Sequence, residues 1–206
     1  MDARYTLTQE EILKFHSIGT IKEYDAGAIV FYENTEAHHF YILLDGLVKG
    51  GRFEGRKENI FHFFFPFMMV GEVSFVEQKY YPLTTVFVTK GKALVLNKNT
   101  LLSGKNISYF NSIFMRSIIG KVRYLQNSIN TLASTDAKMK VAVFISEHSL
   151  WISHISIKEM ATVLNLTRET VSRSIAFFIQ QEALGKNGKK IEIVNIKYIE
   201  NYINTH

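Results

Sequence analysis

The stretch Ile155-Ser-Ile-Lys-Glu-Met-Ala-Thr-Val-Leu-Asn-Leu-Thr-Arg-Glu-Thr-Val-Ser-Arg173 decides the fold of the C-terminal part of the chain. Ser156 stands three residues before Glu159, which is the spacing of a reciprocal capping box and predicts that a helix begins there. Asn165 tolerates the left-handed backbone of a sharp turn, and Thr167 can cap a second helix. Cap, short helix, tight turn and second cap, in this order, predict a helix-turn-helix.

The second predicted helix has two chemically different faces. Val171, Ile175 and Phe178 recur at helical spacing and predict a buried stripe. On the opposite face, arginine can donate two hydrogen bonds to guanine, and glutamate can accept one from cytosine. The alternative is that these charged side chains form an ordinary solvent-exposed helix face. The order of caps and turn favours contact with DNA instead. The predicted DNA-contacting residues of the two helices are Ser156, Thr167, Arg168, Glu169, Thr170, Ser172 and Arg173.

A hairpin, or wing, is predicted after these helices. Asn187-Gly188 suits a two-residue turn with both central residues at positive φ, and apolar runs flank it. Lys186, Lys189 and Lys190 crowd the predicted tip. Lysines there serve solubility by default, but beside a helix that reads DNA they can neutralise phosphates, so we add them to the DNA-contacting set.

These residues resemble the Crp/Fnr superfamily of bacterial transcription regulators, whose reading helix carries an Arg-Glu-Thr-Val-x-Arg pattern, here Arg168-Glu-Thr-Val-Ser-Arg173. The resemblance implies that Arg168, Glu169 and Arg173 read base edges. Ser172 makes the run more like the Fnr branch than the cyclic AMP receptor branch, which implies a half-site of TTGA type. The resemblance also implies a homodimer with no enzymatic activity, which binds double-stranded DNA and works with RNA polymerase.

The upstream residues independently predict a small β-barrel, because turn signals separate short apolar runs at 28–32, 40–44, 60–65, 84–89 and 93–96. The turn signals include Gly27, Asn34, Gly46, Gly50-Gly51, Gly55, Gly71 and Gly91. The family places a jelly-roll sensor domain here. We therefore expect an α+β fold: a cyclic-nucleotide-binding-like jelly-roll barrel over 1–104, a dimerisation helix over 105–133, and a winged helix-turn-helix over 134–206.

The effector pocket is expected around Gly71, Glu72, Pro82 and Leu83. In cyclic-nucleotide binders of this superfamily, an Arg-Ser or Arg-Thr pair stands ten residues after a Gly-Glu pair and holds the phosphate. Pro82 and Leu83 stand at those positions and offer no charge. We therefore expect an unknown small-molecule effector other than cyclic AMP and a structural role for Glu72, although Lys79 leaves room for another anion.

Residues 101–132 carry a coiled-coil pattern, with apolar side chains at alternating steps of three and four: Met115, Ile118, Val122, Leu125, Ile129 and Leu132. We expect Ile118, Val122, Leu125 and Ile129 to form the dimer interface. A helix buried within one subunit is the alternative. Phe110, Ile113, Phe114 and Ile119 widen the apolar face where the helix would pack on its own barrel, and residues 133–136 are expected to form a hinge.

Composition limits the remaining functions. The net charge of +5 is modest, so its placement on one helix face and one hairpin supports DNA binding better than its size does. The chain has no cysteine, which excludes a thiolate-bound iron–sulfur cluster. The N-terminal residues lack the apolar core of a signal peptide, and no apolar run is long enough to span a membrane, so a cytoplasmic protein is expected.

Three alternatives remain open. The first is a haem-dependent nitric oxide sensor of the same family, with His62 as the histidine nearest the expected pocket. His38 and His39 would point to opposite faces of a strand, so we expect no metal site there. The second alternative is a jelly-roll metal enzyme, which would need converging histidine and carboxylate ligands that the sequence lacks.

The third alternative is an architectural protein that binds DNA without reading its sequence. Such a protein has no use for Glu169 on its DNA-facing side.

Overall fold

The computed structural model describes residues 6–55, 57–97, 107–134 and 136–205. The chain forms two compact units, Met1–Tyr124 and Leu125–His206. The long helix α4 (Ile107–Ala133) begins in the first unit and ends in the second. Among the described residues, no helix is long and apolar enough to cross a membrane.

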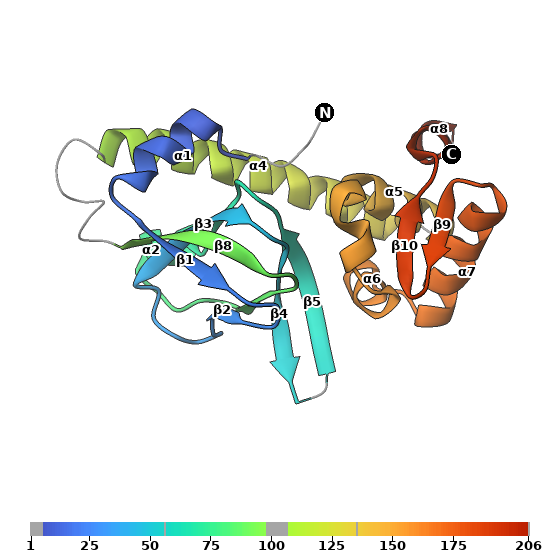
Figure 1. Cartoon of the computed structure of the whole chain (residues 1–206), viewed down its shortest axis with the longest axis horizontal. Coiled ribbons are helices and arrows are strands. Elements are labelled where there is room, and N and C mark those ends of the chain that lie inside the picture. The colour runs from blue at the N-terminus through green and yellow to red at the C-terminus, as the bar shows by residue number, and fades with distance from the viewer. Residues whose placement is uncertain (1–5, 56, 98–106, 135, 206) are drawn as a thin grey trace. The chain divides into compact units, whose positions relative to one another are not determined.

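The first unit is a barrel of two antiparallel sheets, with strand orders β1-β8-β3-β6 and β2-β7-β4-β5 (Figure 1). The strands are β1 (Thr20–Tyr24), β2 (Ile29–Phe31), β3 (His39–Asp45), β4 (Val48–Glu54), β5 (Lys57–Phe64), β6 (Met69–Val70), β7 (Thr84–Phe87) and β8 (Gly91–Asn97). Each of the five apolar runs in the sequence contains a strand or most of one. The α+β fold class with an N-terminal jelly-roll-like barrel is therefore confirmed.

Helices α1 (Gln9–His16) and α4 pack on the first sheet, on the same side of the barrel (Figure 1). Phe15 of α1 and Ile113 of α4 share one buried cluster with Ile42 and Leu94 of that sheet. A short helix, α2 (Glu72–Glu77), follows β6. Burial of these apolar side chains, at about 25 cal/mol per Å² of surface, stabilises the unit.

Gly50 and Gly51 correct one expectation, because they lie inside β4 and not in a turn. The register of β4 against β5 shifts between them, as in a β-bulge. A Cβ atom at Gly50 would lie 2.7 Å from Leu83 Cδ1, and one at Gly51 would lie 2.4 Å from the carbonyl oxygen of Asn59. Both glycines thus allow close packing across the sheet.

The buried residues of α4 are Phe110, Ile113, Ser117, Gly120 and Tyr124, and the partly buried Tyr109 and Phe114 also pack on the barrel core. The small side chains at the middle of this row let the helix approach the barrel closely. Ile119, which was expected on the packed face, is 48% exposed instead, because it lies on the other side of the helix.

The second unit holds the expected helix-turn-helix and wing. Its elements are α5 (Ala137–Glu147), the 3₁₀ helix η2 (Ser149–His154), α6 (Ile157–Leu164), α7 (Arg168–Gln180), β9 (Leu184–Asn187), β10 (Lys190–Ile193) and α8 (Ile196–Thr205). Helix α8, which no sequence pattern predicted, packs against α5. The Tyr202 ring of α8 contacts Phe178, and the Tyr202 hydroxyl lies 3.4 Å from Oδ2 of Asp136, the N-cap of α5. Helix α8 therefore contacts the start of α5.

Candidate nucleic-acid interface

Local capping chemistry fixes the two helices of the candidate interface. The Ser156 hydroxyl accepts a hydrogen bond from the Glu159 amide at 3.2 Å, and the Glu159 carboxylate accepts one from the Ser156 amide at 2.9 Å. Asn165 has φ 50°, so the left-handed turn is confirmed. The Thr167 hydroxyl accepts from the Thr170 amide at 3.2 Å and begins α7. The predicted capping box and second cap are both present.

Helix α7 separates a buried stripe from a polar face. Val171, Ile175 and Phe178 are fully buried, whereas Arg168, Glu169 and Arg173 are exposed. Ser172 and Thr170 are half-buried beside them. The buried stripe holds the helix in the unit and leaves both arginines and the glutamate on the free side.

Hydrogen bonds and charges organise this polar face. The Thr170 hydroxyl lies 3.0 Å from that of Thr167 and accepts from Arg173 Nη2 at 3.5 Å. The pKa of Glu169 is lowered, first by the backbone amide of Glu169 and by the Thr167 hydroxyl, and then by the charges of Arg168 and Arg173. Glu169 is therefore ionised at neutral pH and able to accept a hydrogen bond from a base.

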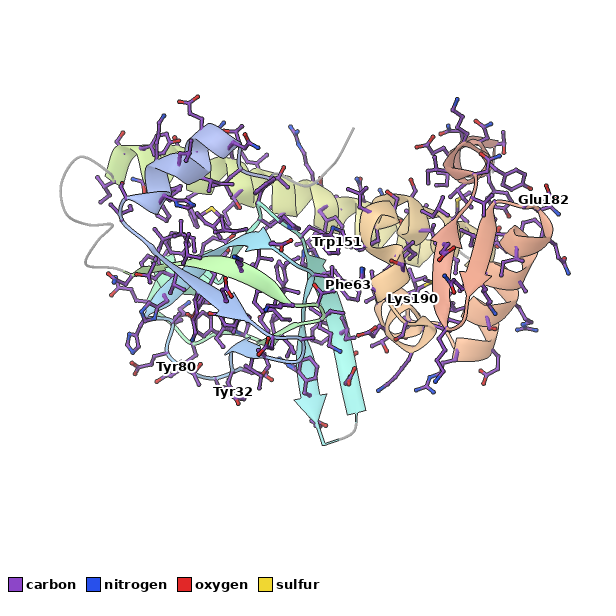
Figure 2. The ribbon with its side chains drawn as sticks, in the orientation of Figure 1. Tyr32, Phe63, Tyr80, Trp151, Glu182 and Lys190 are labelled. Carbon is purple, nitrogen blue, oxygen red and sulfur yellow. The ribbon has the colours of Figure 1, made fainter. Side chains whose placement is uncertain are left out.

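The wing has a different turn from the expected one. Lys190 pairs with Asn187 across the hairpin, so the two central residues are Gly188 and Lys189. Of these, only Gly188 has a positive φ, at 61°. That pattern is typical of a type II′ turn, which needs glycine at its first central position only. Lys186, Lys189 and Lys190 are all exposed, and Figure 2 labels Lys190 on β10.

The four residues of the expected effector pocket lie in different surroundings. Pro82 is exposed, and Leu83 packs on Gly50. Gly71 has φ 80°, and a Cβ atom there would lie 2.9 Å from the Tyr81 ring. Glu72 is 1% exposed and contacts α4. Neither charge nor hydroxyl from positions 82 and 83 is available to hold a phosphate.

Glu72 binds two residues of α4 that no motif in the sequence indicates. Its Oε1 atom accepts hydrogen bonds from the Lys121 ammonium and, at 3.5 Å, from the Ser117 hydroxyl. Lys121 Nζ also donates to the carbonyl oxygen of Met69 at 3.0 Å. A buried carboxylate needs such a partner, because an unpaired charge away from water is costly.

His62 lies edge-on to the rings of Phe64 and Tyr124, with ring centroids 4.5 and 4.7 Å away. His62 is half-buried, and its ring packs on these two aromatic side chains. Exposed His38 contacts Glu36 at 3.0 Å. Within the part of the chain that the structure describes, no three histidine, aspartate or glutamate side chains are close enough to hold a metal ion.

The residues of the expected dimer interface form an apolar stripe on α4. Val122, Leu125 and Ile129 are 48%, 56% and 64% exposed, and Ile118 is half-buried. Met115 and Leu132 extend the stripe in both directions and are also exposed. Such a row of large apolar side chains is costly to leave in water.

Comparisons with known proteins agree with this architecture. Residues 21–104 match the model of the cyclic nucleotide-binding domain family. A CRP-like cAMP-activated global transcriptional regulator of Mycobacterium tuberculosis is 23% identical over 184 residues, which cover 83% of this chain and 82% of that protein.

Solved structures extend the likeness to the whole fold. FixK2 from Bradyrhizobium japonicum has a TM-score of 0.74 and 19% identity, covering 89% of this chain and 96% of that one. A CRP-family transcriptional regulator from Thermus thermophilus has a TM-score of 0.72 and 16% identity, covering 89% and 97%. The likeness thus spans barrel, long helix and helix-turn-helix.

Proposed function

We propose that this chain, which belongs to the Crp/Fnr superfamily of transcription regulators, binds DNA as a homodimer and reads sequence through α7. The observation that supports the proposal most directly is the polar face of α7, where Arg168, Glu169 and Arg173 are exposed opposite a fully buried stripe. Arginine and ionised glutamate can together distinguish guanine and cytosine edges in the major groove. Lys186, Lys189 and Lys190 of the wing would bind phosphates.

The apolar stripe of α4 supports the proposed dimer, because a second copy of the same helix could cover it. Two-fold symmetry would then place two α7 helices in successive major grooves, about 34 Å apart. The DNA site would be an inverted repeat with half-sites one helical turn apart. From the Fnr-like Ser172, we propose half-sites of TTGA type.

We propose that the sensor barrel responds to a signal other than a cyclic nucleotide, since Pro82 is exposed and Leu83 packs on Gly50. Regulation would involve contact with RNA polymerase at a promoter, in the cytoplasm, where the DNA lies. The contacts shown for His62 are with the Phe64 and Tyr124 rings, and we therefore do not propose haem as the signal-binding group.

Selection of bound duplexes from a random pool tests the proposal. Purified full-length protein should enrich inverted repeats, and the triple variant R168A/E169Q/R173A should enrich none while keeping the same thermal unfolding midpoint. Enrichment of no sequence by the unchanged protein would contradict specific reading. If the triple variant enriched the same sequences equally, residues outside α7 would have to read the DNA sequence.

A further inference from the structure

Glu72 stands out because its carboxylate is buried and its partners come from one helix. The side chain is 1% exposed, whereas the surface pair of Lys92 and Glu23 has side chains that are 49% and 60% exposed. Lys121 itself is only 23% exposed. A charge pair so far from water gains more from its contact, and loses more when one partner is removed, than a surface pair does.

The Lys121 ammonium sits among groups that recognise such a cation. It contacts the carboxylate of Glu72 and the carbonyl oxygen of Met69, and it lies 5.8 Å from the centroid of the Phe64 ring. Carboxylates and carbonyl oxygens accept its hydrogen bonds, and an aromatic face attracts its charge. Glu72 Oε2 is buried and has no hydrogen-bond partner among the described residues. Nothing else in the described barrel therefore replaces Lys121 on this carboxylate.

We propose that Glu72, Met69 and Phe64 form an ammonium-binding site that the chain fills with its own Lys121. Lys121 acts as a tethered ligand and holds α4 against the barrel without a small molecule. Helix α4 also carries the apolar stripe of the proposed dimer interface and continues to Ala133. DNA binding therefore requires Lys121 to hold this helix in place, and it needs no added cyclic nucleotide. A signal received by the barrel would act by separating Lys121 from Glu72. This inference rests on the proposed function for its DNA-binding part only.

Chemical rescue tests the site directly. Lys121→Ala removes three methylene groups and the ammonium, which together correspond to n-propylammonium. The variant should unfold at a lower temperature than the unchanged protein, and n-propylammonium chloride should raise its midpoint saturably. Potassium chloride at equal ionic strength and n-propanol should not.

Arg116→Ala is the matched control, because Arg116 joins α4 to Glu11 of α1 by a more exposed ion pair. It should lose stability without gaining any response to n-propylammonium. In the double variant E72Q/K121A neither charge remains, so it should be more stable than Lys121→Ala and should not respond either. If Lys121→Ala cannot be purified, the expected result is that E72Q/K121A still folds, because it lacks the unpaired charge of Glu72, and its failure to fold as well would overturn the inference.

DNA binding gives the second readout, measured by fluorescence anisotropy on a selected duplex without any cyclic nucleotide. The unchanged protein and Arg116→Ala should bind alike, and Lys121→Ala should bind on the order of tenfold more weakly, recovering with n-propylammonium. The inference is overturned if Lys121→Ala binds DNA as tightly as the unchanged protein does. It is also overturned if potassium chloride rescues Lys121→Ala as well as n-propylammonium does, or if n-propylammonium rescues E72Q/K121A too. Failure of the unchanged protein to bind any duplex counts against the proposed function, and thermal rescue alone then decides whether the ammonium site exists.

Discussion

Two single residues of the second unit, Arg173 and Lys189, carry the same charge but are expected to contact different parts of DNA. Arg173 lies on α7 beside Thr170, and Lys189 lies in the turn of the wing. Arg173→Ala should cost about 1–3 kcal/mol on the specific duplex and relax preference at one G·C pair. Lys189→Ala should weaken all duplexes nearly alike and lower the salt slope by about one.

Anisotropy titrations at several salt concentrations, on cognate and scrambled duplexes, measure both effects. If Arg173→Ala weakened the two duplexes equally, its assignment to a base contact would be wrong, and a phosphate contact would replace it. If Lys189→Ala changed sequence preference, the wing would have to be counted among the reading elements.

Pro82 and Leu83 lead to a second prediction at this scale. Cyclic AMP and cyclic GMP should not bind with useful affinity, because a phosphate at these positions would find no charged partner. Isothermal titration calorimetry of the full chain measures this. Micromolar binding of either nucleotide would show that another residue, with Lys79 the first to examine, holds the phosphate.

Among the elements, helix α7 is followed by a residue in a strained backbone conformation. Glu182 has φ 55°, and the amide of the next residue, Ala183, donates to the Phe178 carbonyl oxygen, as in a Schellman motif. Glycine suits this position because it has no Cβ atom. Glu182→Gly should therefore raise the free energy of unfolding by about 1 kcal/mol.

Gln181 provides the control for that change, because its φ is −87° and it needs no glycine. Gln181→Gly should lower the free energy of unfolding by a few tenths to about 1 kcal/mol. Urea denaturation of the full chain, followed by circular dichroism, compares the two. If both glycines destabilised α7 equally, the strain assigned to Glu182 would be absent.

Elements set by local chemistry could be predicted from the sequence, and those set by distant contacts could not. The caps at Ser156 and Thr167 depend on partners three residues away, so their residue types reveal them. Gly50 is a glycine because Leu83 packs on it, and nothing near Gly50 in the sequence shows this. The pairing of Glu72 with Lys121 joins positions 49 apart and was missed for the same reason.

The wing turn shows the same limit within a few residues. Asn187-Gly188 favours a turn with both residues at its centre, but the pairing of β9 with β10 places Asn187 in the strand. Strand register, which includes the pairing of Ile191 with Lys186, decides the turn and overrides the preference of the dipeptide. The existence of the hairpin was thus predictable, and its central residues were not.

For the whole molecule, the apolar stripe of α4 predicts the state of association. The double variant V122D/L125D places two charges in the stripe and should produce monomers, because a buried unpaired carboxylate costs several kcal/mol. Sedimentation velocity measures the masses. N127D/N130D adds the same charges at exposed polar positions of α4 and should remain dimeric.

A dimer that survives V122D/L125D would assign the interface to another surface. Monomers from both double variants would instead mean that added charge, and not its place on the helix, disrupts association. Only monomers from the first and dimers from the second support the stripe as the interface.

The pairing of β1 with β8, and the packing of α8 against α5, have a consequence for synthesis. In each unit, a segment that is synthesised early packs with one that is synthesised late. Thr20 of β1 pairs with Val95 of β8, and Asp136, the N-cap of α5, contacts Tyr202 of α8. At translation rates of about 5–20 residues per second, β1 waits on the order of 10 s for its neighbour. During that time β3 also lacks β8, so two strand edges of the nascent chain lie open to other chains. A chain cut short before β8 is therefore prone to aggregation, whereas one that ends within α4 contains every described strand of the barrel.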